Sequence, residues 1–82
     1  MLKVTATIDA GTYDEALEIA REDETLYGVT VEIVSKLHVP SPGFPAASYV
    51  DVIVSGPVDK VINALSEGWG MDGDEIFEGI IP

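Results

Sequence analysis

The stretch Leu2-Lys3-Val4-Thr5-Ala6-Thr7-Ile8-Asp9 decides the fold that the sequence predicts. Its apolar residues occupy every second position, which is the period of a β-strand with one buried face. Gly11 then interrupts the pattern, and Thr12 follows as a favourable N-cap with Glu15 at the spacing of a capping box. The chain is therefore expected to begin with a strand that leads directly into a helix.

This helix is predicted to run from Thr12 to about Asp23, with Ala16, Leu17 and Ala20 on its buried face. The patterns that follow predict, in chain order, a long strand at 29–39, a wide loop at 40–45, a strand at 49–54, a helix from Pro57 to Gly68 and a final strand at 75–81. The alternation in the final strand is the poorest of the series.

The order β-α-β-β-α-β predicts an α+β fold of the ferredoxin-like type. Such a fold has a four-stranded antiparallel sheet with two helices on one of its faces. Residues 1–82 are expected to form a single domain, because the sequence contains no linker, repeat or low-complexity segment.

Acidic residues dominate the charged part of the sequence. Fifteen Asp and Glu oppose four Lys and Arg, and the formal net charge is -11. The acids concentrate at 14–24 and 67–78, and no base follows Lys60. Such a field repels nucleic acids and anionic membranes and attracts basic surfaces. We therefore expect a basic protein surface as partner, with no direct binding of DNA or RNA and no membrane contact.

The residues needed for catalysis or metal binding are missing from the sequence. There is no cysteine, and His38 is the only histidine, so a transition-metal site cannot be completed. Asp72-Gly73-Asp74 resembles the start of a calcium loop but lacks the glycine and glutamate required further on. Gly68-Trp69-Gly70 lacks the spacing and the lysine of a phosphate loop. We therefore expect that the protein is not an enzyme and has no catalytic residues, no metal and no cofactor.

A cytoplasmic location is expected from the same composition. The lack of cysteine fits a reducing compartment. Residues 1–5 alternate as a strand does and show no apolar stretch of the kind found in a signal peptide.

The predicted topology places the start of the first helix and the loops around residues 40–45 and 68–75 at one end of the domain. Acids from both clusters would then surround two aromatic residues, Trp69 and Phe44. These aromatics are either anchors for a partner or lids over the core. The candidate partner-binding residues are Asp14, Glu15, Glu18, Glu22, Phe44, Trp69, Asp72, Asp74 and Glu75.

Small size, strong negative charge, missing catalytic motifs and a compact predicted fold resemble the small acidic proteins that phages encode against host defences, including anti-CRISPR inhibitors and other DNA mimics. The resemblance implies an inhibitor whose carboxylates stand in for phosphates and block a basic nucleic-acid-binding site on a partner protein, in the cytoplasm of the host. Two alternatives stay open. One is a structural or regulatory ferredoxin-like module, as a monomer or weak homodimer, and the other is a domain adapted to high salt.

Overall fold

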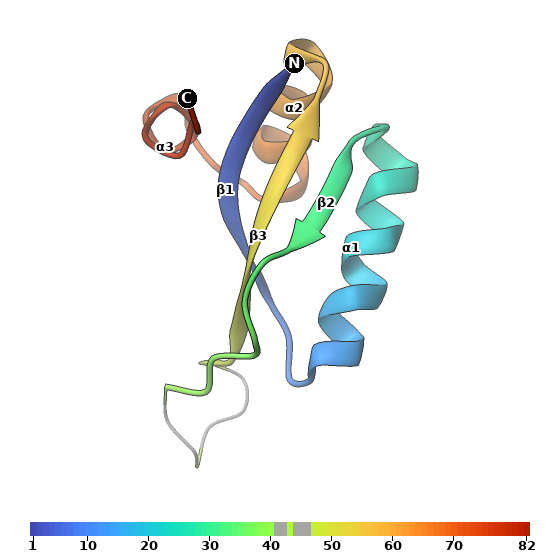
Figure 1. The fold of residues 1–82 in the computed structure, drawn as a ribbon, viewed down its shortest axis with the longest axis vertical. Coiled ribbons are helices and arrows are strands. Elements are labelled where there is room, and N and C mark those ends of the chain that lie inside the picture. The colour runs from blue at the N-terminus through green and yellow to red at the C-terminus, as the bar shows by residue number, and fades with distance from the viewer. Residues whose placement is uncertain (41–42, 44–46) are drawn as a thin grey trace.

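The computed structural model describes residues 1–40, 43 and 47–82. Its sheet has three antiparallel strands in the order β1-β3-β2 (Figure 1). The elements are β1 (Leu2–Asp9), α1 (Tyr13–Tyr27), β2 (Thr30–Ile33), β3 (Tyr49–Gly56), α2 (Val58–Asn63), the π-helical turn η2 (Ala64–Gly68) and α3 (Gly73–Glu78). The sheet and the three α-helices together make an α+β fold.

Local signals fix both ends of α1. The hydroxyl of Thr12 accepts a hydrogen bond from the N–H of Glu15 at 3.1 Å, and the Glu15 carboxylate accepts one from the N–H of Gly11 at 3.4 Å. The helix ends at Gly28, whose φ of 68° is favourable only for glycine. It therefore extends one turn beyond Asp23, the end expected from its apolar pattern.

The core lies on one face of the sheet, beneath α1, α2 and η2. The buried side chains are Val4, Ile8, Ala10, Ala16, Ala20, Val29, Val31, Val50, Val52, Val54, Val61, Ala64, Leu65 and Ile76. Valines predominate because the even-numbered positions of β1 and β3 alternate toward this layer. The opposite face of the sheet carries Thr5, Thr7 and Asp51 and is covered by no helix of the core layer.

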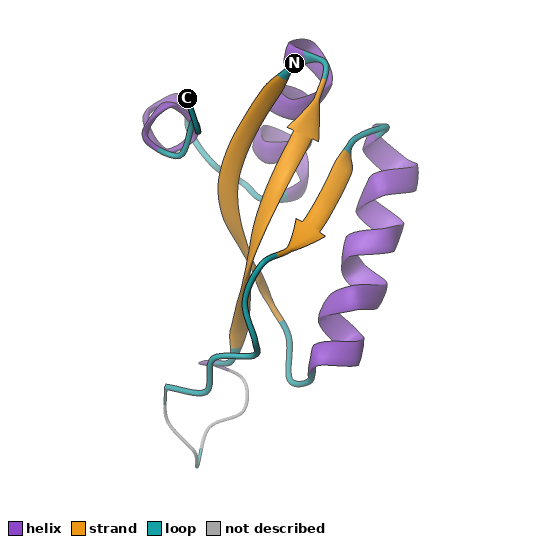
Figure 2. Cartoon of the chain, in the orientation of Figure 1, coloured by secondary structure: helices purple, strands orange, loops and turns teal. Residues whose placement is uncertain are grey.

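The predicted four-stranded ferredoxin-like sheet is wrong, because most of the expected last strand is the helix α3 (Figure 2). Asp72 and Glu75 form a complete capping box: Asp72 Oδ1 accepts from the Glu75 N–H at 2.9 Å, and Glu75 Oε1 accepts from the Asp72 N–H at 3.4 Å. This local pairing favours a helix, and the adjacent apolar residues of the segment do not alternate as a strand requires.

Of the expected last strand, only residues 79–81 lie alongside β1. The Thr5 N–H donates to the Gly79 carbonyl at 2.8 Å, the Ile81 N–H donates to the Lys3 carbonyl at 2.9 Å, and Val4 and Ile80 form an isolated bridge. These contacts cover the beginning of the outer edge of β1. Within the described part of the chain, the sheet gains no fourth strand from them.

The predicted strand at 29–39 is also shorter than expected. Four residues lie between Ile33 and His38, but only two lie between their partners Val52 and Tyr49, so the ladder with β3 is interrupted. Between these pairs, the Asp51 N–H donates to the hydroxyl of Ser35 at 2.8 Å. A side chain thus takes the place of a backbone acceptor, and regular pairing stops.

Gly79→Ala is expected to destabilise the protein by roughly 1–3 kcal/mol, the usual cost of overpacking. An added Cβ would lie 2.9 Å from the carbonyl oxygen of Thr5 and 3.0 Å from Cγ1 of Val4. Gly73→Ala is the matched control, since no atom lies within 4 Å of its added Cβ. Urea denaturation measures both changes, and equal midpoints would show that the contact between β1 and residues 79–81 is loose.

Candidate functional site

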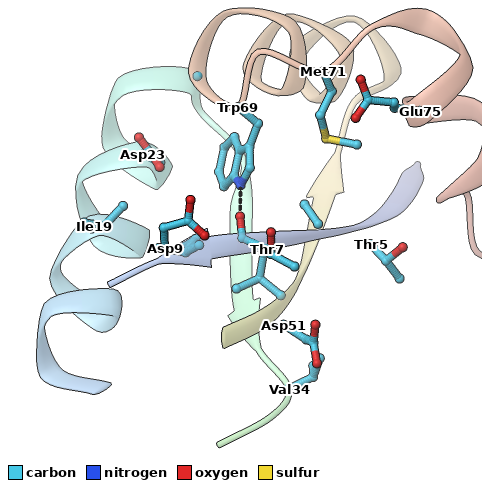
Figure 3. A pocket seen from close by; sticks show the side chains of 14 residues that line it. Thr5, Thr7, Asp9, Ile19, Asp23, Val34, Asp51, Trp69, Met71 and Glu75 are labelled. Carbon is cyan, nitrogen blue, oxygen red and sulfur yellow. Dashed lines mark hydrogen bonds between the residues drawn. The ribbon is translucent and has the colours of Figure 1, made fainter. Parts of the chain in front are cut away.

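A groove with a volume of about 680 Å³ runs along the outer edge of β1 (Figure 3). Its lining includes four carboxylic acids, which come from β1, α1, β3 and α3: Asp9, Asp23, Asp51 and Glu75. Among the described residues that line it, none is a lysine or an arginine. The groove is therefore a negatively charged concave surface that favours cationic groups.

Trp69 lies over the β1 edge and forms part of the groove (Figure 3). Its indole Nε1–H donates to the carbonyl oxygen of Thr7 at 2.8 Å, and its ring packs half-buried against the core beside Met71. Trp69 thus has the contacts of a lid in the unbound protein. Phe44, the second predicted aromatic, lies outside the described residues.

Trp69→Ala is expected to lower the free energy of unfolding by about 2–3 kcal/mol, because packing and a hydrogen bond are both lost. Trp69→Phe should cost about 1 kcal/mol, mainly for the hydrogen bond to Thr7. Phe77→Ala is the control, because Phe77 is 76% exposed and its loss should change stability little. Chemical denaturation gives the three values. If the Trp69→Ala variant is as stable as Phe77→Ala, Trp69 does not cover the core as described.

The two acidic clusters do not form the expected ridge at one end of the molecule, although Asp23 of the first cluster and Glu75 of the second both line the groove. Asp14 and Glu15 lie in the first turn of α1, which begins beyond the C-terminal end of β1. Helix α3 lies beside the N-terminal half of β1, to which residues 79–81 bind (Figure 1). Asp72, Asp74 and Glu75 are therefore separated from the start of α1 by several residues of strand. The expected common ridge is replaced by two exposed acidic surfaces. One lies on α1 and the other on α3, and their exposed acids include Asp14, Glu15, Glu18 and Glu22 on α1 and Asp74 and Glu78 on α3.

The acids of α1 differ in their surroundings. Glu18 and Glu22 are exposed, whereas Asp23 and Glu24 are partly covered. Glu24 Oε2 accepts from the Val31 N–H at 2.9 Å, and Oε1 forms an ion pair with Arg21. The bond from Val31, and then the charge and hydrogen bond of Arg21, lower the pKa of Glu24. Burial, and then the neighbouring charge of Glu22, raise the pKa of Asp23.

Glu24→Gln is expected to lower stability by about 1 kcal/mol at pH 7, where the charged carboxylate holds the edge of β2. Since the folded pKa of Glu24 is lowered, its contribution is complete above the unfolded value of about 4.3. The contribution disappears as the pH falls through the lower folded pKa. The difference from wild type should therefore shrink in acid, as urea midpoints at pH 7 and pH 3 would show. Glu18→Gln on the same helix is the control, and an unchanged Glu24→Gln difference at pH 3 would exclude this linkage.

The sequence did not identify Phe77 as a candidate. The strand predicted at 75–81 includes Phe77, but this residue lies on α3 and has the most exposed aromatic side chain of the described residues. Asp74 stands three residues before Phe77 and four before Glu78, the two spacings that make helical residues neighbours, so both lie on the side of Asp74. We call Asp74, Phe77 and Glu78 the α3 acidic face. The capping-box spacing of Asp72 and Glu75 was the signal that could have revealed it.

His38 is half-buried and interacts with two residues of β3. Its Nε2 lies 3.0 Å from Asp51 Oδ2, and its ring centroid lies 4.8 Å from that of Tyr49. Ser35, which is also nearby, uses its hydroxyl to donate to the Lys36 carbonyl at 2.9 Å. These contacts hold the segment in which the β2–β3 ladder is interrupted. Ser35 and His38 do not form a nucleophile–base pair, because the serine hydroxyl donates to the backbone.

Comparison with models of protein families, with curated proteins and with solved structures found no match for this chain. Across residues 1–40, 43 and 47–82, no helix has the length and apolar character to cross a bilayer. The same residues contain no group of three or more His, Cys, Asp or Glu that could hold a metal ion. The groove and the two acidic surfaces are the features of the molecule that bear on its function.

Proposed function

We propose that the protein is a non-enzymatic acidic binding protein that occupies a basic, nucleic-acid-binding site on a partner protein. The observation that carries the proposal is the α3 acidic face, on which two exposed carboxylates flank an exposed aromatic ring. Protein–protein interfaces are enriched in aromatic side chains, including Phe, and have polar residues at their rim.

The carboxylates of both surfaces are available to a partner. Among the described residues, the only ion pairs are Arg21–Glu24 and His38–Asp51. Glu18, Glu22, Asp74 and Glu78 therefore face solvent without a basic side chain to neutralise them. A basic partner would supply the missing counter-charge and would associate faster because of the long-range field.

The acids of α1 also have a spacing that suits a phosphate mimic. Glu18 and Glu22 are separated by one helical turn, about 6 Å along the axis. Two base steps along one nucleic-acid strand span about 6.8 Å. Together with the small size and the net charge of -11, this spacing supports an inhibitor of the kind that phages direct against nucleic-acid-handling host proteins.

The proposal is tested by capturing partners from nuclease-treated bacterial lysate on the immobilised protein. A captured protein must then release labelled DNA or RNA when free acidic protein is added, which fluorescence polarisation measures. Asp59→Asn on α2 is the control variant, because it removes one acid that lies outside both acidic surfaces. Captured proteins that keep their nucleic acid at saturating acidic protein would contradict the proposal.

A further inference from the structure

The outer edge of β1 is only partly paired. Backbone groups of alternate residues point to the same side of a strand, so those of Lys3, Thr5, Thr7 and Asp9 all point outward. Residues 79–81 pair with the first two of these positions. Beyond them, the Thr7 carbonyl is bonded only by the Trp69 indole, and the N–H groups of Thr7 and Asp9 have no partner among the described residues.

The open part of this edge lies within the acidic groove. Thr5, Thr7 and Asp9 all line it, and the distance from Thr5 to Asp9 is about 13 Å, the length of four strand steps. Exposed edges of this kind are templates for an added strand. The groove provides room for such a strand beside β1.

The acids of the groove stand on both sides of the sheet. Asp51 is opposite Thr7 on the face away from the helices, whereas Asp23 belongs to α1 on the helix-covered side. Side chains of an added strand would point alternately toward these two sides. Each side would then offer a carboxylate, because only Oδ2 of the half-exposed Asp51 contacts His38. A strand with basic residues on both faces is therefore complementary to the groove.

We propose that the β1 edge binds an extended, lysine- or arginine-rich segment of a partner protein by strand addition, with Trp69 moving off the Thr7 carbonyl. This inference rests on the proposed function for the basic character of the partner and adds the mode of recognition. The backbone of the segment supplies the hydrogen bonds, and Asp9, Asp23, Asp51 and Glu75 select its charge.

A second copy of the chain fits this edge poorly. Two β1 strands placed side by side would bring the carboxylates of two grooves together without any lysine or arginine in the lining. Like charges placed across neighbouring strands are destabilising. The charge of the groove thus favours a basic segment over self-association.

The test uses a seven-residue peptide of alternating lysine and threonine and a copy that is N-methylated at every backbone nitrogen. Both peptides carry the same charge, but only the first can donate backbone hydrogen bonds to β1. Isothermal titration at low salt should show at least about tenfold tighter binding of the unmethylated peptide, the effect of losing one or two hydrogen bonds. Hydrogen exchange of the Thr7 amide should slow when this peptide is bound.

Variants of the protein locate the binding site. Asp9→Asn and Asp23→Asn should each weaken binding of the unmethylated peptide severalfold, whereas the α2 control Asp59→Asn should not. Trp69→Phe, which keeps a ring but frees the Thr7 carbonyl, should bind the peptide more tightly than wild type. Thermal melts show whether each variant is folded before its binding is compared.

Equal binding of the two peptides would overturn strand addition and would leave attraction of a basic partner intact. Absence of binding by both peptides would also overturn the inference, while the nucleic-acid displacement experiment decides the proposed function independently. Protection of the Thr7 amide without peptide, together with a dimer in sedimentation, would assign the edge to a second copy and would likewise overturn the proposal.

Discussion

Leu65→Ala is expected to lower the free energy of unfolding by about 3–5 kcal/mol, the range for a buried leucine that leaves a cavity. Leu65 has no exposed surface and is the largest fully buried side chain of the described residues. It belongs to η2, in the helical layer above the valines of the sheet. A chain of this length has a total stability of about 4–12 kcal/mol, so the variant should lose a large part of it.

The matched control is Leu26→Ala on α1, where the leucine is 71% exposed. The same atoms are removed there, but little buried surface is lost, and the change should stay within about 0.5 kcal/mol. Urea denaturation followed by circular dichroism gives both values. A Leu65→Ala variant within 1 kcal/mol of the control, on the scale of these cavity effects, would mean that η2 is not packed on the sheet as described.

The second large effect concerns the α3 acidic face. With a partner identified by nucleic-acid displacement, Phe77→Ala should weaken binding by about 30-fold or more, which corresponds to a hot spot of about 2 kcal/mol. Asp74→Lys with Glu78→Lys should slow association, and the effect should be larger at low salt because screening is then weaker. Within the described part of the chain, neither carboxylate makes a hydrogen bond that these changes would break, unlike those of Asp72 and Glu75, which cap α3.

The control for charge is Asp59→Lys, and the control for apolar surface is Leu26→Ala. Both residues are exposed and lie outside the α3 acidic face. Surface plasmon resonance separates the association and dissociation rates of each variant. If the α3 variants bind as tightly as these two controls while remaining folded, the proposed binding surface is ruled out.

The sequence was sufficient for the elements whose signals are local. The alternation in residues 2–9 predicts β1, and Thr12 with Glu15 predicts the start of α1. It failed at residues 75–81, where the order of the preceding elements suggested a fourth strand but the capping box at Asp72 favoured a helix. There, a local signal outweighed the expected topology.

Less of the candidate site could be predicted. The acids were visible in the sequence, but the groove depends on Trp69 reaching Thr7, a contact between residues 62 positions apart. No periodic pattern reports such a contact. Phe77 is unpredicted for a different reason, because the strand expected at 75–81 gives no indication that its side chain is exposed on one side of a helix.

The strand order β1-β3-β2 has a consequence for how the chain folds during its synthesis. Both neighbours of β3 precede it in the sequence, so neither β1 nor β2 has its strand partner until residues 49–56 have been made. Only α1 can form earlier from local contacts. The pairing of β2 with β3 closes only the loop at 34–48, whereas the pairing of β1 with β3 closes the much longer segment 10–48, so completion of the sheet is a late and comparatively slow event. Until then, the acids at 14–24 repel other unfinished chains and oppose their aggregation.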